Sequence, residues 1–355
     1  MSASIYEKMG QMIMIGLDVD KINDEIRKLI KDYKIGGVVL YKSNYKDIKS
    51  MVNFINELKK INGDNVPLFI AIDQENGRVN RLPDEITRIY NPLRQAKTMN
   101  IDVVNKCNEI TAKILADVGV NMNLAPLLDI NYNSDNTSIG NRSYGDKKAV
   151  IKYGLPMVET MKRHGIISVV KHFPGHGLVK TDSHYLIPVI NNVSLMEDDL
   201  EIYDKAISNG ADAIMIGHLK VCGFGSKPAS INRDIIDKYL IKRYDYKGLI
   251  ITDDLRMNTM KYMYGIKNVI SKSIEAKNDI LMIKYKKGDI KKIYNELYKM
   301  IDSGKIDKNL INNSYEKIIN LKNKYKLSND IKDGNIDIDE FNKEIIDVNS
   351  MMEEK

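Results

Sequence analysis

Short apolar runs recur along the chain, separated by longer segments of mixed polarity. Apolar residues are nearly continuous within each run and do not alternate with polar ones, which is typical of strands buried on both faces of a parallel sheet. The pattern therefore predicts eight parallel strands, at residues 11–16, 36–41, 67–73, 122–127, 166–171, 212–217, 248–253 and 278–283.

The segments between the runs have helical spacing. Residues 49–60 and 150–164 carry apolar side chains at i, i+3 and i+4, which indicates amphipathic helices that cross over between strands. Two further helices are predicted after the last run, at 287–301 and 310–327. Eight strand-and-helix units favour an α/β fold of the (β/α)8 TIM barrel type, as a single catalytic domain over residues 1–327. An open doubly wound sheet is the alternative.

The last part of the chain, residues 328–355, is polar and has no strand pattern. Residues 329–340 look like a calcium loop when Gly334 is placed at the loop glycine. That placement puts Ile331 at a ligand position, and isoleucine has no side-chain oxygen to offer calcium. We therefore expect a short polar C-terminal tail exposed to solvent.

Composition excludes several classes of protein. Of the 355 residues 43% are hydrophobic, which is enough to build a large core and rules out disorder. The net charge of +6 is mild and the charges are interspersed, so we expect neither a nucleic-acid nor a membrane partner. The chain shows no signal-peptide pattern, and Cys107 and Cys222 are too few for a disulfide framework. These features favour a cytoplasmic protein, and we expect a monomer.

Candidate chemistry is concentrated where the predicted strands end, which is where barrels of this type place their active sites. Charged groups directly after apolar runs must be paired or solvated, because burying them alone is costly. Several strand ends of this kind indicate one polar pocket. The side chains concerned are Asp73, Gln74 and Glu75 after the third run, Asp129 and further along Arg142 after the fourth, Lys171, His172, His176, Asp182 and His184 around the fifth, His218 after the sixth, and Asp253 and Asp254 after the seventh.

Each of these side chains also has an ordinary structural interpretation. Asp253 is a suitable N-cap for the next helix. Lys171 and His172 are compatible with a structural pair in the barrel mouth. Asp182 and His184 stand two residues apart, so an extended backbone would point both to one side, as a surface ion pair or as an imidazole oriented and kept protonated by a carboxylate.

A zinc site is a further alternative, with His172, His176 and His184 as ligands beside a carboxylate. His172 and His176 have the i, i+4 spacing that one helix would present to a metal. Pro174 and Gly175 between them break such a helix, however. We therefore expect neither a metal nor another cofactor.

The motifs occur together in one order. Asp73-Gln-Glu comes first, Lys-His-Phe-Pro-Gly-His-Gly follows at 171–177 with Asp182-Ser-His184 just after it, and Thr-Asp-Asp-Leu-x-Met ends the series at 252–257. In this order they resemble glycoside hydrolase family 3, and more closely its single-domain β-N-acetylglucosaminidases, also called β-hexosaminidases. The resemblance extends over residues 5–327, which is the whole predicted barrel.

The resemblance implies roles for individual residues. Asp253 matches the catalytic nucleophile, His184 the general acid/base and Asp182 the residue that orients His184, whereas Asp254 matches a cap or structural partner. The residues that match positions holding the sugar are Asp73, Arg81, Arg142, Lys171 and His172. Asn76 departs from the pattern, which has a second glycine before Gly77. Asparagine tolerates left-handed backbone angles, so we expect the turn to be kept.

The function that follows is a retaining exo-β-N-acetylglucosaminidase acting on a small carbohydrate. We expect it to release terminal, non-reducing, β-linked N-acetylglucosamine from peptidoglycan fragments during muropeptide recycling, through a covalent glycosyl-enzyme. Chitin-derived oligosaccharides as substrates and phosphate in place of water are the alternatives within this class. A metal-dependent barrel hydrolase is the alternative from a different class.

Overall fold

The computed structural model describes residues 3–132, 136–179, 187–191 and 193–353. Its centre is an eight-stranded sheet in the order β10-β1-β2-β3-β4-β5-β7-β9, with all neighbours parallel. A parallel bridge between Ile251 and Ile280 joins β9 to β10, so the sheet closes into a barrel. The strands are β1 (Ile13–Leu17), β2 (Gly37–Leu40), β3 (Phe69–Ile72), β4 (Met122–Asn123), β5 (Ile167–Phe173), β7 (Ala213–Ile216), β9 (Leu249–Thr252) and β10 (Leu281–Lys284).

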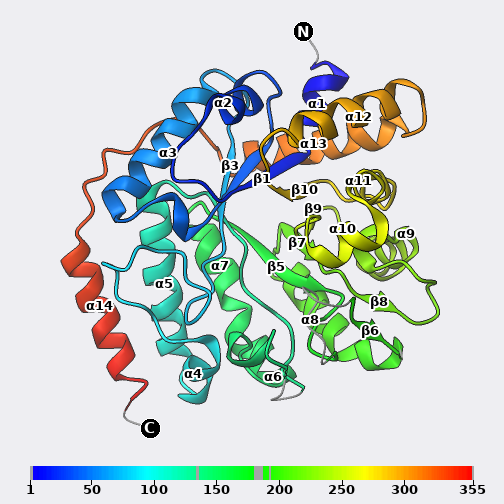
Figure 1. The fold of residues 1–355 in the computed structure, drawn as a ribbon. Coiled ribbons are helices and arrows are strands. Elements are labelled where there is room, and N and C mark those ends of the chain that lie inside the picture. Colours follow the sequence, from blue (N-terminus) through cyan, green and yellow to red (C-terminus); the bar gives the residue numbers. More distant parts are fainter. Residues whose placement is uncertain (1–2, 133–135, 180–186, 192, 354–355) are drawn as a thin grey trace.

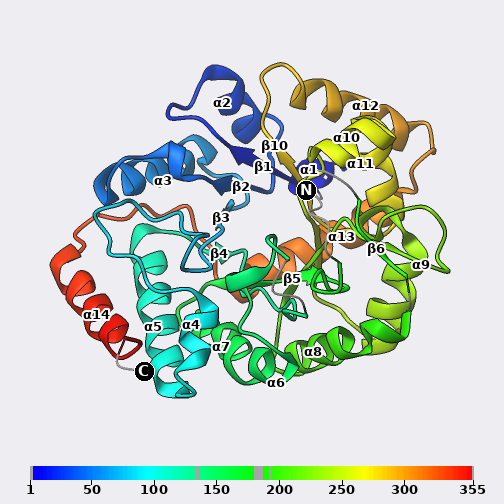
Figure 2. The same ribbon diagram turned by 60° about the horizontal axis from the view of Figure 1, so that its bottom comes forward.

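The barrel confirms the predicted fold and excludes the open doubly wound sheet. Each of the eight apolar runs contains one strand, and helices surround the strands on the outside (Figures 1 and 2). β5 continues two residues beyond the predicted end, so that His172 and Phe173 are part of the strand. A separate pair of short parallel strands, β6 (Val189–Ile190) and β8 (Lys220–Val221), lies outside the barrel.

The helices follow the predicted spacing with one local exception. They are α1 (Ile5–Gln11), α2 (Asp24–Lys31), α3 (Ile48–Asn62), α4 (Pro92–Lys97), α5 (Ile101–Val118), α6 (Lys147–Ala149), α7 (Pro156–Arg163), α8 (Glu197–Ser208), α9 (Arg233–Ile236), α10 (Asn258–Tyr264), α11 (Ile266–Glu275), α12 (Ile290–Asp302), α13 (Lys308–Lys324) and α14 (Ile338–Ser350). The segment predicted as one helix at 150–164 begins as a π-helical stretch, Val150–Gly154, before α7. Pro156 has no N–H to donate, which interrupts the regular α-helical ladder. None of the helices in the described residues combines the length and apolarity that a bilayer crossing requires.

The C-terminal segment differs from the solvated tail that we expected. It contains α14, which lies along the outer side of α5 in both ribbon views (Figures 1 and 2). Phe341, Ile345 and Val348 recur at intervals of four and three residues, which is one face of a helix, and all three are buried. Asp337 is the N-cap of α14, accepting a hydrogen bond from the Glu340 N–H at 2.9 Å. The amphipathic spacing within a polar segment therefore produces a packed helix.

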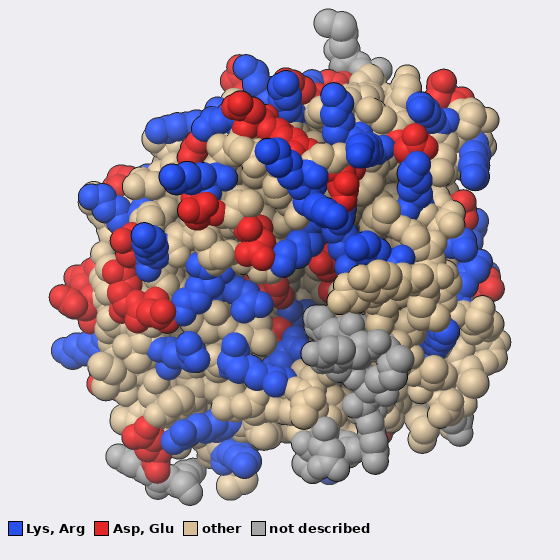
Figure 3. All heavy atoms as spheres, in the orientation of Figure 1, with Lys and Arg blue, Asp and Glu red and all other residues tan. Residues whose placement is uncertain are grey.

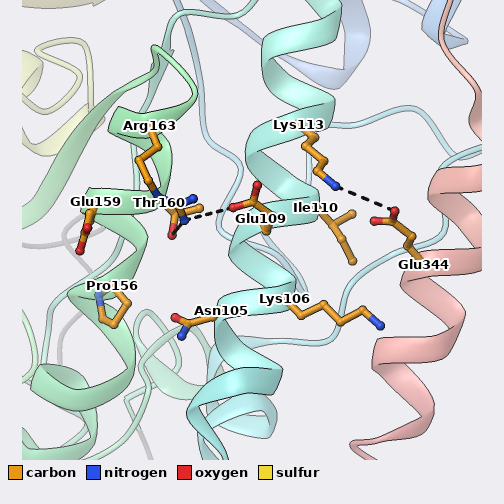
Figure 4. Close-up of a pocket in the computed structure, with 10 residues that line it drawn as sticks. All are labelled: Asn105, Lys106, Glu109, Ile110, Lys113, Pro156, Glu159, Thr160, Arg163 and Glu344. Carbon is orange, nitrogen blue, oxygen red and sulfur yellow. Dashed lines mark hydrogen bonds and ion pairs between the residues drawn. The ribbon is translucent and has the colours of Figure 1, made fainter.

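A groove of about 860 Å³ lies between α5, α7 and α14. Figure 4 shows that its charged side chains pair across the groove, for example Lys113 on α5 with Glu344 on α14 at 4.0 Å. Its lining comes from the outer helices and includes no strand-end residue. The groove is therefore an attachment surface of α14, and the polar strand ends meet elsewhere.

Candidate active site

A pocket of about 600 Å³ lies at the carboxyl ends of the barrel strands. Figure 3 shows a hollow with acidic side chains inside it and basic side chains around it. The pocket brings together, from positions far apart in the chain, six residues to which the resemblance assigned a catalytic or sugar-holding role: Asp73, Arg81, Arg142, Lys171, His172 and Asp253. Glu75, His176 and Asp254, which the sequence also selected at strand ends, line it as well. Tyr41, which follows β2, and Lys284, which ends β10, also line it.

Buried Lys171 and partly buried Arg142 meet one buried carboxylate, Glu75, on one side of the pocket. Lys171 Nζ lies 2.6 Å from Glu75 Oε1 and donates to Asp73 Oδ1 at 2.7 Å. Arg142 binds the same Glu75 in a bidentate manner, donating from Nε to Oε2 at 2.7 Å and from Nη2 to Oε1 at 2.8 Å. Burial opposes ionisation of Glu75, but Arg142 and Lys171 outweigh it and hold the pKa of this carboxyl well below its usual range. The group is thus an ionised hub that fixes both cations at the pocket wall.

His172 is oriented by a buried carboxylate behind it. Its Nδ1 lies 2.7 Å from Asp129 Oδ2, and the His176 backbone N–H donates to Asp129 Oδ1 at 2.7 Å. Burial opposes ionisation of Asp129, yet His172 and His176 lower its pKa below the usual range. An ionised Asp129 accepts the Nδ1 proton of His172, so a neutral ring carries its lone pair on Nε2. Within the described residues that nitrogen makes no hydrogen bond, and it can accept one from a hydroxyl in the pocket.

Asp253 stands directly after β9, and its position is fixed by the sheet. Its backbone N–H donates to the Ile216 carbonyl at 3.1 Å, and its Oδ1 accepts the Asp254 N–H at 2.7 Å. Burial opposes ionisation, but His218, His172 and Lys171 together lower the pKa of Asp253. The carboxyl is therefore an ionised group on a rigid element that faces the pocket.

Asp254, the second aspartate of the pair, makes structural contacts. Its Oδ1 accepts the backbone N–H groups of Arg256 and Lys284, both at 3.0 Å, and so ties the end of β9 to β10. The His218 Nε2–H donates to the Asp254 carbonyl at 3.0 Å, while Ser230 Oγ lies 2.7 Å from Nδ1 of the same ring. Since a carbonyl can only accept, the contact with the Asp254 carbonyl places a proton on Nε2 of His218.

Arg81 reaches the pocket from a tight turn after β3. Asn76 has a φ of 72° and Gly77 one of 62°, so the turn is kept with asparagine in place of the expected glycine. A Cβ on Gly77 would lie 2.4 Å from the Asn91 Cβ, which requires glycine at this position. The Nε of Arg81 is buried and has no hydrogen-bond partner within the described residues. It is therefore available to a ligand.

Two of the predicted site residues, Asp182 and His184, lie outside the described residues. Among the residues that the structure describes, no group of three or more His, Cys, Asp or Glu side chains is arranged to hold a metal ion. The Nδ1 of His172, one of the three proposed zinc ligands, bonds Asp129, and Nε2 is the nitrogen that a metal would use. Because His184 lies outside the described residues, the zinc alternative stays untested.

Sequence reasoning did not give Glu75 and Asp129 a role in the site, although both stand at strand ends. A signal for Glu75 was present, because Asp73 and Glu75 have the i, i+2 spacing that points side chains to one side of an extended chain. Lys171 at the end of an apolar strand also requires a counter-charge, which Glu75 supplies. Nothing in the sequence pairs Asp129 with His172, because the two are 43 positions apart.

Comparisons with known proteins agree with this geometry. The family model described as the glycosyl hydrolase family 3 N terminal domain matches residues 4–321. A β-hexosaminidase of Photobacterium profundum is 31% identical over 279 residues, covering 78% of this chain and 82% of that protein. A β-hexosaminidase of Neisseria gonorrhoeae is 29% identical, with 76% and 77% covered. The solved structure of a glycoside hydrolase family 3 β-N-acetylglucosaminidase from Paenibacillus sp. matches with a TM-score of 0.92 and 28% identity, over 99% of this chain and 69% of that chain. This chain belongs to glycosyl hydrolase family 3 and is a glycoside hydrolase.

Proposed function

We propose that the protein is a retaining exo-β-N-acetylglucosaminidase. The observation that carries the proposal is the ionised, strand-borne carboxylate of Asp253 in a pocket whose walls are fixed hydrogen-bond donors. The similar proteins named β-hexosaminidase and β-N-acetylglucosaminidase support the choice of sugar. No cofactor takes part in the reaction that we propose.

The proposed reaction has two steps. The Asp253 carboxylate attacks the anomeric carbon, the glycosidic bond breaks, and the His184 imidazolium gives its proton to the departing oxygen. In the second step the same imidazole takes a proton from water, which attacks the anomeric carbon and releases Asp253. Two inversions leave the product with the configuration of the substrate. Asp182 is proposed to orient His184 and to favour its protonated form.

The proposed sugar-binding residues are Asp73, Arg81, Arg142, Lys171 and His172. Lysine and arginine side chains only donate hydrogen bonds, while the carboxylate of Asp73 only accepts them. His172 adds an acceptor at Nε2 in its neutral form. A sugar carries hydroxyl groups that both donate and accept, so this mixed set of groups fits it.

We propose peptidoglycan fragments as the substrate, in a cytoplasmic recycling role and with the protein as a monomer. Among the described residues, the pocket lining contains six Lys or Arg side chains, namely Arg78, Arg81, Arg142, Lys171, Arg256 and Lys284, against four carboxylates, Asp73, Glu75, Asp253 and Asp254. An excess of positive charge attracts anionic substrates. Peptidoglycan fragments carry carboxylates, whereas chitin-derived oligosaccharides are neutral.

The experiment is a substrate panel. Chromogenic β-N-acetylglucosaminide, β-glucoside and β-N-acetylgalactosaminide are compared first, and turnover of the first alone is expected. A carboxylated peptidoglycan disaccharide and chitobiose are then compared at low salt and at about 0.5 M salt, and the preference for the acidic substrate should shrink with salt. Accumulation of N-acetylglucosamine 1-phosphate in phosphate buffer would identify phosphate as the acceptor and contradict hydrolysis. Equal turnover of chitobiose and the disaccharide at both salt concentrations would contradict the peptidoglycan assignment.

A further inference from the structure

The C-terminal helix α14 is bonded to the long loop between β3 and α4. Asn342 Nδ2 donates to the Glu85 carbonyl at 2.8 Å, and its Oδ1 accepts the Thr87 N–H at 2.7 Å. Asn349 repeats the arrangement two turns later in the helix. Its Nδ2 donates to the Arg88 carbonyl at 3.0 Å, and its Oδ1 accepts the Tyr90 N–H at 3.2 Å. Each of the two asparagine side chains therefore donates one hydrogen bond to a backbone carbonyl of the loop and accepts one from a backbone N–H, as a neighbouring strand does.

Ile89 lies between Arg88 and Tyr90, the two residues that Asn349 contacts, and it is hydrogen-bonded to the turn at the edge of the active site. The Ile89 carbonyl accepts the Gly77 N–H at 2.9 Å, and Gly77 packs directly against Asn91. The backbone of the turn also closes on itself, because the Glu75 N–H donates to the Val79 carbonyl at 3.1 Å. Asn349, the 88–90 segment and the turn at Gly77 thus form one continuous series of contacts.

The turn carries three charged side chains of the pocket. Glu75 is the first residue of the turn, which we define as residues 75–81, and it holds Lys171 and Arg142. Arg78 and Arg81 line the pocket from the same turn. The backbone of residues 75–81 helps to place these groups, and the Arg78 guanidinium is held in addition by the carbonyls of Thr137 and Ser138, at 2.6 and 2.8 Å. A displacement of about 1 Å in such groups is enough to weaken substrate binding substantially.

We propose that α14 is a positioning element of the active site, in which Asn342 and Asn349 hold the loop 85–90 so that the turn 75–81 presents Arg78 and Arg81 to the bound sugar. This inference rests on the proposed glycosidase site. Asn349 is 8% exposed, so its amide has no water to replace the loop backbone if the contact is lost. Asp253 is borne by β9, on a different part of the barrel. The positioning effect is therefore directed at substrate binding and not at the nucleophile.

The test is the double variant Asn342→Ala/Asn349→Ala, measured beside Phe341→Leu. Phe341 anchors the same helix through its apolar face, so its truncation lowers the stability of α14 and removes no hydrogen bond to the loop. We expect the double variant to raise KM about tenfold with kcat within about threefold, because an interaction that holds the substrate throughout the reaction is lost. Phe341→Leu should lower Tm and leave KM unchanged. Lys343→Ala, on the same helix, controls for changes in helix surface.

Amide hydrogen exchange provides a readout that does not depend on turnover. Peptides covering residues 76–90 should exchange faster in the double variant, and those covering β9 should not change. A KM within about twofold of wild type, or an equal rise of KM in Phe341→Leu, would overturn the proposal. Wild type that hydrolyses no substrate of the panel would contradict the proposed function. Faster exchange of residues 76–90 in the double variant would still show that Asn342 and Asn349 support the loop and the turn.

Discussion

The carboxyl group of Asp199 lies directly against Gly175, so closely that a Cβ on this glycine would come within 2.4 Å of the Asp199 Cγ. Asp199 belongs to the first turn of α8, and Tyr132 donates a hydrogen bond to its Oδ2 at 3.1 Å. Its Oδ1 has no hydrogen-bond partner in the described part of the chain. Burial, together with the nearby charge of Asp129, raises the pKa of Asp199 well above the usual range. The structure therefore places a carboxyl group with a raised pKa against Gly175, next to His176.

The first prediction concerns the stability of an Asp199→Asn variant. A folded-state pKa above the unfolded value of about 3.9 means that the folded protein binds more protons than the unfolded chain between the two values. As the pH rises through this window, the free energy of unfolding of wild type therefore falls by about 1.4 kcal/mol for each pH unit. Asparagine does not titrate, so the variant should match wild type below about pH 4 and be more stable near pH 7. Urea unfolding at a series of pH values measures the difference, and a constant difference across the series would contradict the prediction.

The second prediction concerns Asp253. Asp253→Ala should lower kcat by several orders of magnitude, because each factor of ten corresponds to about 1.4 kcal/mol of barrier and covalent catalysis is lost. A slow fluorinated glycoside that traps the intermediate should label Asp253 in wild type. Asp254→Asn is the matched control, since its contacts join β9 to β10, and it should mainly lower Tm. An adduct found on Asp254 or Asp73 would show that the nucleophile is assigned wrongly.

The third prediction separates His184 from a second carboxylate as the acid. His184→Ala should nearly lose turnover of alkyl and sugar glycosides, whose leaving groups need a proton. Activated aryl glycosides should give a burst of phenol followed by a slow steady state, because the second step still needs a base. Asp182→Asn should show a milder defect and a shifted pH–rate profile. Equal losses on both types of substrate without a burst would mean that a different residue is the acid.

The fourth prediction concerns the charge hub. Glu75→Gln leaves Lys171 and Arg142 buried without their shared carboxylate, and breaking such a buried pair costs about 3–5 kcal/mol. Because the pKa of Glu75 is lowered on folding, its contribution is complete above the unfolded value of about 4.3 and is lost as the pH falls through the lower folded value. The difference between wild type and variant should therefore shrink in acid.

Glu109→Gln is the control for Glu75→Gln. Glu109 lies on the outer helices, where it is partly exposed, and it pairs with Arg163 at 3.2 Å and with His164 Nε2 at 2.6 Å. Ion pairs near the surface contribute about 1 kcal/mol or less. Thermal unfolding of both variants at about pH 7 and at about pH 2 gives the comparison, because the loss occurs below the unfolded pKa of about 4.3. Similar losses in the two variants would show that the hub is no more important to stability than a surface ion pair.

The sequence predicted the strands well because parallel strands are buried on both faces and leave a continuous apolar signal. It placed the end of β5 two residues early, since His172 is polar and its partner Asp129 comes from another strand end. Local pattern cannot reveal a counter-charge that the barrel brings in from elsewhere. The six predicted residues found in one pocket were identified by strand-end position and motif order, which do not require knowledge of contacts.

The prediction for the C-terminal segment was wrong for a different reason. A polar composition was taken to mean a solvated tail, although Phe341, Ile345 and Val348 had helical spacing. The hydrogen bonds that Asn342 and Asn349 make with the β3–α4 loop each pair a backbone group with an asparagine amide. Such contacts cannot be predicted from amino-acid composition, because asparagine is equally common in exposed loops.

The bond between α14 and the β3–α4 loop has a consequence for the order of events during protein synthesis. Asn349 is 261 residues from Arg88 and 259 residues from Tyr90 in the chain. A ribosome that adds about 5–20 residues per second makes the loop about 13–50 seconds before it makes the helix that holds it. Most of the barrel is translated within that interval, so its strands can pair while the turn at Gly77 still lacks its support. Under the positioning role proposed for α14, the turn at Gly77 gains its support only after the barrel strands have been translated.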